Sequence, residues 1–169
     1  MRASREPEVE SLRSRIAAFL ERHTTLTLAT VGEDCLPAAA AVFYAHDADL
    51  SLYFLSEERT RHGDNLTRTR QVAGTIHADG QDWRSIRGLQ VRGTADKVPL
   101  VGVAHATAVY VRKFAFLGAL LAGGGAGGEL AVPLARARFW VLRPTWFRLI
   151  DNTAGFASKQ VLNLDDLEC

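Results

Sequence analysis

The chain has 169 residues, of which 47% are hydrophobic and 23% charged, and its formal net charge is +1. This length and composition predict a single soluble globular domain over residues 1–169. A nearly neutral chain of this kind gives no reason to expect nucleic acid or a membrane as a partner. The two cysteines, Cys35 and Cys169, exclude a disulfide scaffold and fit a reducing cytoplasm, and the charged N-terminus shows no secretory signal.

Residues 8–20 carry apolar side chains at helical spacing, which predicts an amphipathic helix. The period then changes to alternation, with many β-branched residues. This pattern predicts strands over residues 23–31, 37–45 and 50–55, which are joined by short polar turns. Neighbouring strands with such short connections form antiparallel hairpins.

The second half of the chain shows further helical and strand patterns. A polar helix is predicted over residues 59–70, strands over 71–78 and 86–98, and a helix over 99–121 that ends in the glycines of 123–128. Residues 138–143 and 145–150 form either two strands or one strand bent at Pro144, because proline cannot donate to a strand ladder. Hairpins dominate, so the predicted fold class is mainly β, a six-stranded antiparallel barrel with flanking helices.

The segment 52–66 contains the residue types that a phosphate site needs. A strand is predicted to end just before Ser56, and a helix begins close by. Ser56 and Thr60 supply hydroxyls, while Arg61 and His62 supply charge or N–H donors. Phosphates in proteins are held by backbone N–H groups at helix starts, by hydroxyls and by guanidinium groups. A solvated connection between strand and helix is the alternative, since these residue types are also common in surface loops.

The pattern Ser-x-x-x-Thr-Arg-His after a strand resembles the phosphate-binding region of the pyridoxamine 5'-phosphate oxidase-like flavoproteins. Residues 23–31, 86–95 and 144–159 also resemble parts of that family, the last of them a small uncharacterised branch. The resemblance implies a split β-barrel of the FMN-binding type and a homodimer with FMN at the subunit interface. A barrel this small has no interior room for a flavin, whereas a crevice between two barrels can bury its ring.

The same resemblance implies roles for individual residues. Ser56 and Thr60 would donate hydroxyls to the FMN phosphate, and Arg61 would form the main ion pair. His62 stands where many relatives carry lysine, so its positive charge would depend on pH. For Tyr44 a strand position at an interface is the alternative, for Trp140 a place in the core or at the dimer interface, and for Asn152 and Lys159 a solvated surface. The residues expected along or near the flavin are Val42, Phe43, Tyr44, Leu55, Gln90, Trp140, Asn152 and Lys159.

The sequence departs from the relatives that oxidise pyridoxamine phosphate. Residues 161–169 lack the Arg-Leu-Ala-Pro type of tail, and Ala40 lies where a basic residue is expected. We therefore expect an FMN-dependent oxidoreductase that acts on another small-molecule substrate or electron donor, with no side chain assigned as catalytic acid or base. A non-catalytic flavin- or haem-binding module and a structural dimer with a vestigial site are the alternatives. The histidines and cysteines show no metal-ligand spacing, so no metal site is predicted.

Overall fold

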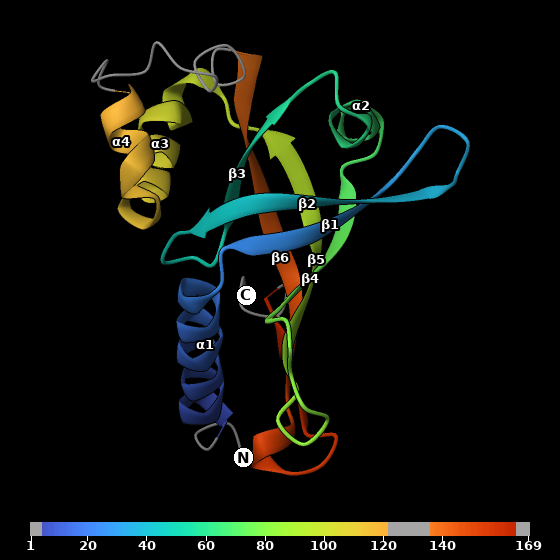
Figure 1. Cartoon of the computed structure of the whole chain (residues 1–169), viewed down its shortest axis with the longest axis vertical. Coiled ribbons are helices and arrows are strands. Elements are labelled where there is room, and N and C mark those ends of the chain that lie inside the picture. Colours follow the sequence, from blue (N-terminus) through green and yellow to red (C-terminus); the bar gives the residue numbers. More distant parts are fainter. Residues whose placement is uncertain (1–4, 122–135, 165–169) are drawn as a thin grey trace.

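The computed structural model describes residues 5–121 and 136–164. Its strands form one antiparallel sheet in the order β3-β2-β1-β4-β5-β6-β7, and pairing of β3 with β6 closes the first six into a barrel (Figure 1). The mainly β fold and the six-stranded antiparallel barrel are thus confirmed. Strand β7 is an addition that the sequence did not predict, and it lies outside β6. The strand bounds are β1 (Thr25–Val31), β2 (Pro37–His46), β3 (Leu52–Glu57), β4 (Gln71–His77), β5 (Arg87–Lys97), β6 (Ala137–Asp151) and β7 (Lys159–Asn163).

The helices lie outside the barrel, with α3 and α4 together on one side and α2 on the other (Figure 1). The α-helices are α1 (Arg5–Arg22), α2 (Arg61–Arg68), α3 (Val103–Lys113) and α4 (Ala115–Leu121), and short 3-10 helices cover Leu100–Gly102 and Asn152–Ala154. None of the helices in the described part of the chain is long and apolar enough to cross a membrane.

The prediction of one continuous helix over residues 99–121 is wrong. The chain leaves the helical conformation at Phe114, where φ is −119° and ψ is 73°. Phe114 and Leu117 are both buried, and the Phe114 ring centre lies 4.8 Å from that of Tyr110. The break therefore lets the apolar side chains on both sides of it contact the same surface over β2 and β3. The glycines of 123–128 lie outside the described residues.

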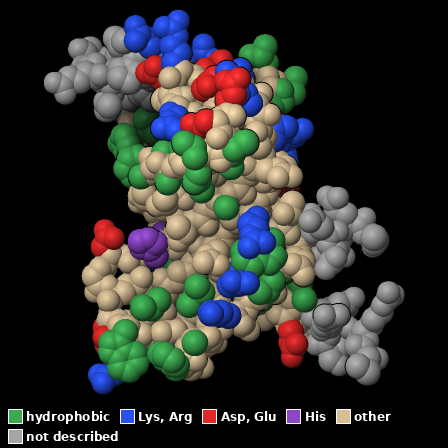
Figure 2. Space-filling view, turned by 90° about the vertical axis from the view of Figure 1, so that its right-hand side faces the viewer, with side chains coloured by type: hydrophobic (Ala, Val, Ile, Leu, Met, Phe, Trp, Pro, Cys, Tyr) green, Lys and Arg blue, Asp and Glu red, His purple; other side chains and the backbone are tan. Residues whose placement is uncertain are grey.

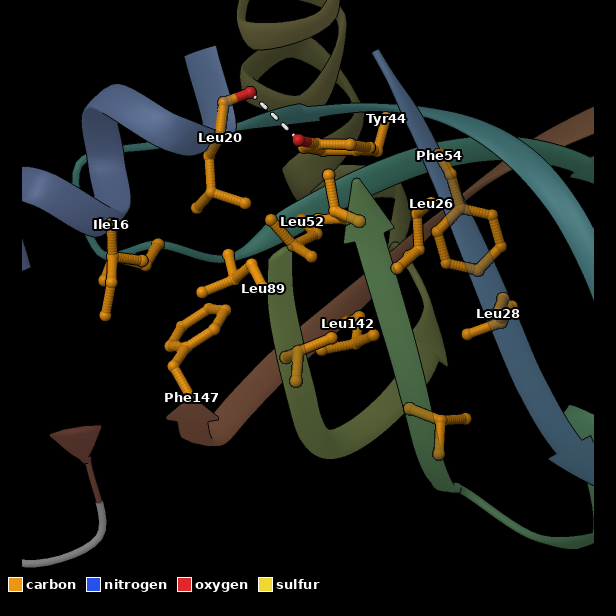
Figure 3. Close-up of a cluster of buried hydrophobic side chains, with 14 of the residues drawn as sticks. Ile16, Leu20, Leu26, Leu28, Tyr44, Leu52, Phe54, Leu89, Leu142 and Phe147 are labelled. Carbon is orange, nitrogen blue, oxygen red and sulfur yellow. Dashed lines mark hydrogen bonds between the residues drawn. The ribbon is translucent and has the colours of Figure 1, made fainter. Parts of the chain in front are cut away.

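The barrel interior is filled by large apolar side chains. Strand alternation turns one face of each strand inward, so that Leu26, Leu52, Phe54 and Leu89 meet in the centre (Figure 3). Helix α1 adds further apolar side chains to this core. The buried hydroxyl of Tyr44 has a hydrogen-bond partner, because it donates a hydrogen bond of 2.9 Å to the backbone oxygen of Leu20. A core packed in this way leaves any flavin-sized ligand to bind outside the barrel.

Strand β6 is one bent strand, which decides between the two alternatives that the sequence left open. The first residues of β6 pair with β3, and its last residues pair with β7. Its pairing with β5 changes register between Arg92 and Gly93 of β5. Pro144 lies opposite Gly93 at this bulge. A side chain on Gly93 would overlap the backbone oxygen of Arg143, so the close approach of the two strands requires glycine there.

Gly93→Ala is therefore expected to destabilise the protein by about 1–3 kcal/mol, because the added methyl group must push the strands apart. Gly88→Ala on the same strand is the matched control, since the nearest atom to its added carbon would be 3.7 Å away. The control should remain within about 1 kcal/mol of the wild type. Urea unfolding of both variants measures the difference, and equal stability of the two would contradict the role assigned to Gly93.

Candidate functional site

The connection between β3 and α2 is a tight corner held by its own side chains. The Thr60 hydroxyl accepts a hydrogen bond of 3.1 Å from the Gly63 N–H and donates one of 2.8 Å to the Glu57 oxygen, so Thr60 is the N-cap of α2. A side-chain carbon on Gly63 would lie only 2.6 Å from the Glu57 oxygen. Strand β3 continues to Glu57, so the prediction that it ends at Leu55 is wrong, and Ser56 belongs to the strand.

Three of the four predicted phosphate-binding residues meet at this corner. The Ser56 Oγ lies 2.6 Å from the Nε2 of His62 and 3.2 Å from the Oγ1 of Thr60. Ser56 is 8% exposed, and burial lowers the pKa of His62 below its ordinary value of 6.5. The His62 imidazole is therefore neutral at physiological pH, and it shares one hydrogen bond with the serine hydroxyl.

The fourth predicted residue, Arg61, points away from that cluster. Its side chain is 66% exposed, and its guanidinium lies 3.8 Å from the Asp34 carboxylate on the connection between β1 and β2. The backbone of Arg61 opens the first turn of α2, whose first N–H groups have no acceptor within the helix. We call Ser56, Thr60, Arg61 and His62 together the β3–α2 corner.

Long-range pairing brings further basic residues beside the β3–α2 corner. Arg138 on β6 lies opposite Ser56, and the Trp140 indole N–H donates a hydrogen bond of 3.3 Å to the Ser56 oxygen. A cavity of about 470 Å³ lies here, lined by Glu57, Glu58, Arg59, Arg136 and Arg138. Sequence reasoning missed Arg136 and Arg138, because no local pattern shows that residues 136–138 return to the end of β3.

The predicted flavin-contacting residues on β2, β3 and β6 divide between the core and the surface. Val42, Tyr44 and Trp140 are buried in the barrel, which is the core alternative given for Trp140. Tyr44 also lies in the core, which was not among the places expected for it, and the three side chains are at most 7% exposed. Phe43 faces outward from β2 and is 60% exposed, while Leu55 lies partly buried under α3.

The remaining predicted residues lie away from the β3–α2 corner of their own chain. Gln90 is exposed on β5, opposite Arg148 of β6. Asn152 follows β6, where its amide donates a hydrogen bond of 2.7 Å to the Trp83 oxygen and accepts one of 3.2 Å from the Ala157 N–H. Lys159 is exposed at the start of β7.

The architecture defines the class of protein: a closed six-stranded antiparallel barrel with helices outside it is a split β-barrel. Residues 12–150 match the sequence model of the family described as pyridoxamine 5'-phosphate oxidase. The chain therefore belongs to the pyridoxamine 5'-phosphate oxidase family, and the resemblance inferred from its sequence is confirmed.

Proteins similar to this chain carry different descriptions. A UPF0306 protein of Klebsiella pneumoniae is 32% identical over 148 residues, which cover 85% of this chain and 88% of the relative. The structure of a heme binding protein from Mycobacterium smegmatis is similar with a TM-score of 0.64 at 19% identity, over 87% of this chain and 56% of that chain. A structure described as an F420 reductase has a TM-score of 0.56 at 26% identity, over 77% of this chain and 93% of that chain.

Thr60→Ala should destabilise the protein by about 1 kcal/mol, because it removes the hydroxyl that caps α2. Thr60→Ser keeps that hydroxyl and should retain most of the stability. Chemical denaturation followed by circular dichroism measures both variants. If serine were as harmful as alanine, the threonine methyl group rather than the cap would be the stabilising feature.

Proposed function

We propose that this protein binds FMN by its phosphate at the β3–α2 corner and works as an FMN-dependent oxidoreductase. The observation that carries this proposal is the convergence of Ser56, Thr60 and His62 at the start of α2. When bound, the flavin supplies the hydride or electron transfer, and the protein binds and orients it. No side chain is assigned as a proton donor or acceptor.

The chemistry of the corner fits a phosphate group. Both hydroxyls can rotate from their present partners to donate to phosphate oxygens, and neutral His62 can donate one N–H. The N–H groups of the first turn of α2 and the positive end of its dipole also favour an anion. The Arg61 guanidinium can join them, because an exposed ion pair such as the one with Asp34 is weak.

The flavin ring needs a different kind of surface. The barrel interior is filled, so the ring must lie on the outside, where an apolar ring is stabilised only if something covers it. Val31, Leu36 and Phe43 on the hairpin of β1 and β2 are 40%, 56% and 60% exposed. We therefore propose a homodimer in which the second chain covers this hairpin and FMN lies at the interface, open on one side to a small-molecule substrate or electron donor.

A module that binds flavin or haem without turnover is the second candidate. It is favoured by the fold shared with the Mycobacterium smegmatis structure, which is described as a heme binding protein. Titration of the purified protein with FMN and with haem, followed by addition of NADH or NADPH, separates the candidates. Turnover with FMN supports the oxidoreductase, binding without turnover supports the module, and binding of neither ligand leaves a structural dimer with a vestigial site.

Arg61→Ala should weaken FMN binding by roughly tenfold or more, because a charge-assisted hydrogen bond contributes on the order of 1.5–3 kcal/mol. Arg68→Ala is the matched control, since Arg68 lies in the last turn of the same helix and pairs with Glu33 at 2.9 Å. Riboflavin lacks the phosphate and should bind both variants and the wild type alike. Equal FMN affinity of the wild type and the Arg61 variant would remove this residue from the site.

FMN affinity should rise as the pH falls through the lowered pKa of His62, because the protonated imidazole adds a positive charge beside the phosphate. His62→Lys keeps its charge in this range, so it should bind FMN more tightly than the wild type at neutral pH and with a flatter pH profile. Calorimetric titrations between roughly pH 5.5 and 8 measure this. Protonation of the FMN phosphate affects the wild type and His62→Lys equally, so it cannot cause a difference between them. If FMN affinity depended on pH in the same way in both proteins, His62 would have no role in phosphate binding.

A further inference from the structure

Two arginines and a tryptophan meet on the outer face of the ladder between β5 and β6. Arg92 lies opposite Trp146, and Gln90 lies opposite Arg148, so strand alternation turns all four side chains to the same face. The guanidinium carbons of Arg92 and Arg148 lie 4.6 Å and 4.9 Å from the centre of the Trp146 ring. We call Arg92, Trp146 and Arg148 the Arg–Trp ridge.

The positive charges of the ridge lack carboxylate partners. Arg92 and Arg148 have no acidic group within ion-pair distance among residues 5–121 and 136–164, unlike two neighbouring arginines. Arg143, earlier on β6, pairs with Asp96 at 3.4 Å, and Arg87, earlier on β5, pairs with Asp151 at 3.1 Å. Two like charges beside a single ring repel each other, and an anion bound between them would remove that cost.

The indole limits the freedom of both guanidinium groups, whose carbons lie 4.6 Å and 4.9 Å from its centre. A guanidinium placed against a ring loses little further freedom on binding, and it can donate two parallel hydrogen bonds to a phosphate or carboxylate. Gln90 is exposed beside them and adds amide donors. Across β4 the facing residues are Ala73 and Thr75, which are small, so a ligand has room to lie next to the ridge.

The ridge and the β3–α2 corner are separate in one chain. Trp146 follows Arg138 by eight residues along β6, which corresponds to roughly 25 Å of extended strand. The face shown in Figure 2 carries Lys and Arg side chains in two places, near its top and in its lower half. Anion binding at the two places can therefore be measured independently.

We propose that the Arg–Trp ridge is a second anion-binding site, which takes a small molecule carrying a phosphate or carboxylate group. Both guanidinium groups hold the oxyanion, Trp146 limits their freedom and Gln90 adds a neutral donor. None of these residues belongs to the β3–α2 corner, but Gln90 is also among the residues expected along the flavin, so the test uses an anion that has no flavin ring.

The test is a titration of the full chain with inorganic pyrophosphate, observed through the indole N–H signals of its three tryptophans in ¹H–¹⁵N NMR. The Trp146 signal, assigned with Trp146→Phe, should shift saturably, while the Trp83 signal stays in place. A shift of the Trp140 signal would report pyrophosphate at the β3–α2 corner, because the Trp140 indole N–H is bonded to the Ser56 oxygen. Trp83 is an internal control, since it carries the single Arg84 guanidinium 4.8 Å from its ring. A parallel titration with succinate tells whether carboxylates bind as well as phosphates, and either ligand supports the site.

Substitutions show which residues produce the shift of the Trp146 signal. The double variant Arg92→Gln/Arg148→Gln should lose pyrophosphate affinity by roughly tenfold or more, because the charge-assisted hydrogen bonds are gone. Arg92→Lys keeps the positive charge but cannot donate two parallel hydrogen bonds, so it should lose part of the pyrophosphate affinity. Ser56→Ala and Arg84→Gln should leave the Trp146 response unchanged. Absence of a saturable Trp146 shift in the wild type, or an undiminished shift in the double variant with its other indole signals in place, would overturn the proposal.

Discussion

The pairing of β3 with β6 closes the barrel, and the rest of the structure depends on it. Residues Leu52–Glu57 lie against Ala137–Leu142, which brings Phe54 and Trp140 into the core and seats Ser56 beside the start of β6. Because the closed barrel is filled by its own side chains, ligand binding is left to its outer surface and its ends. The β3–α2 corner exists because one closing strand turns directly into a capped helix.

The two proposals place two kinds of anion site on this barrel. At the β3–α2 corner the donors are hydroxyls, helix N–H groups and a neutral imidazole, with Arg61 at the solvent side. At the proposed Arg–Trp ridge the donors are guanidinium groups. The proposed phosphate site is sensitive to pH through His62. In a homodimer, residues distant from a corner in their own chain become available to the corner of the other chain.

Features that depend on neighbours in sequence were predictable, and those that depend on long-range register were not. Ser56, Thr60 and His62 lie within seven positions, so their convergence follows from one strand-to-helix turn. Alternation located the strands, but it did not show which face of the alanine-rich β2 turns inward, and so Tyr44 was placed at a ligand rather than in the core. Arg92 meets Trp146 only through the pairing of β5 with β6. The break at Phe114 reflects packing of both flanks on the barrel, which helical spacing cannot reveal.

The central claim is that the β3–α2 corner holds the phosphate of a flavin nucleotide, and a crystal structure grown with FMN measures this most directly. The expected result is a phosphate group within hydrogen-bonding distance of Ser56 Oγ and Thr60 Oγ1, with His62 Nε2 turned toward the phosphate. A structure in which FMN lies elsewhere, with the hydrogen bond between Ser56 and His62 intact, would contradict it.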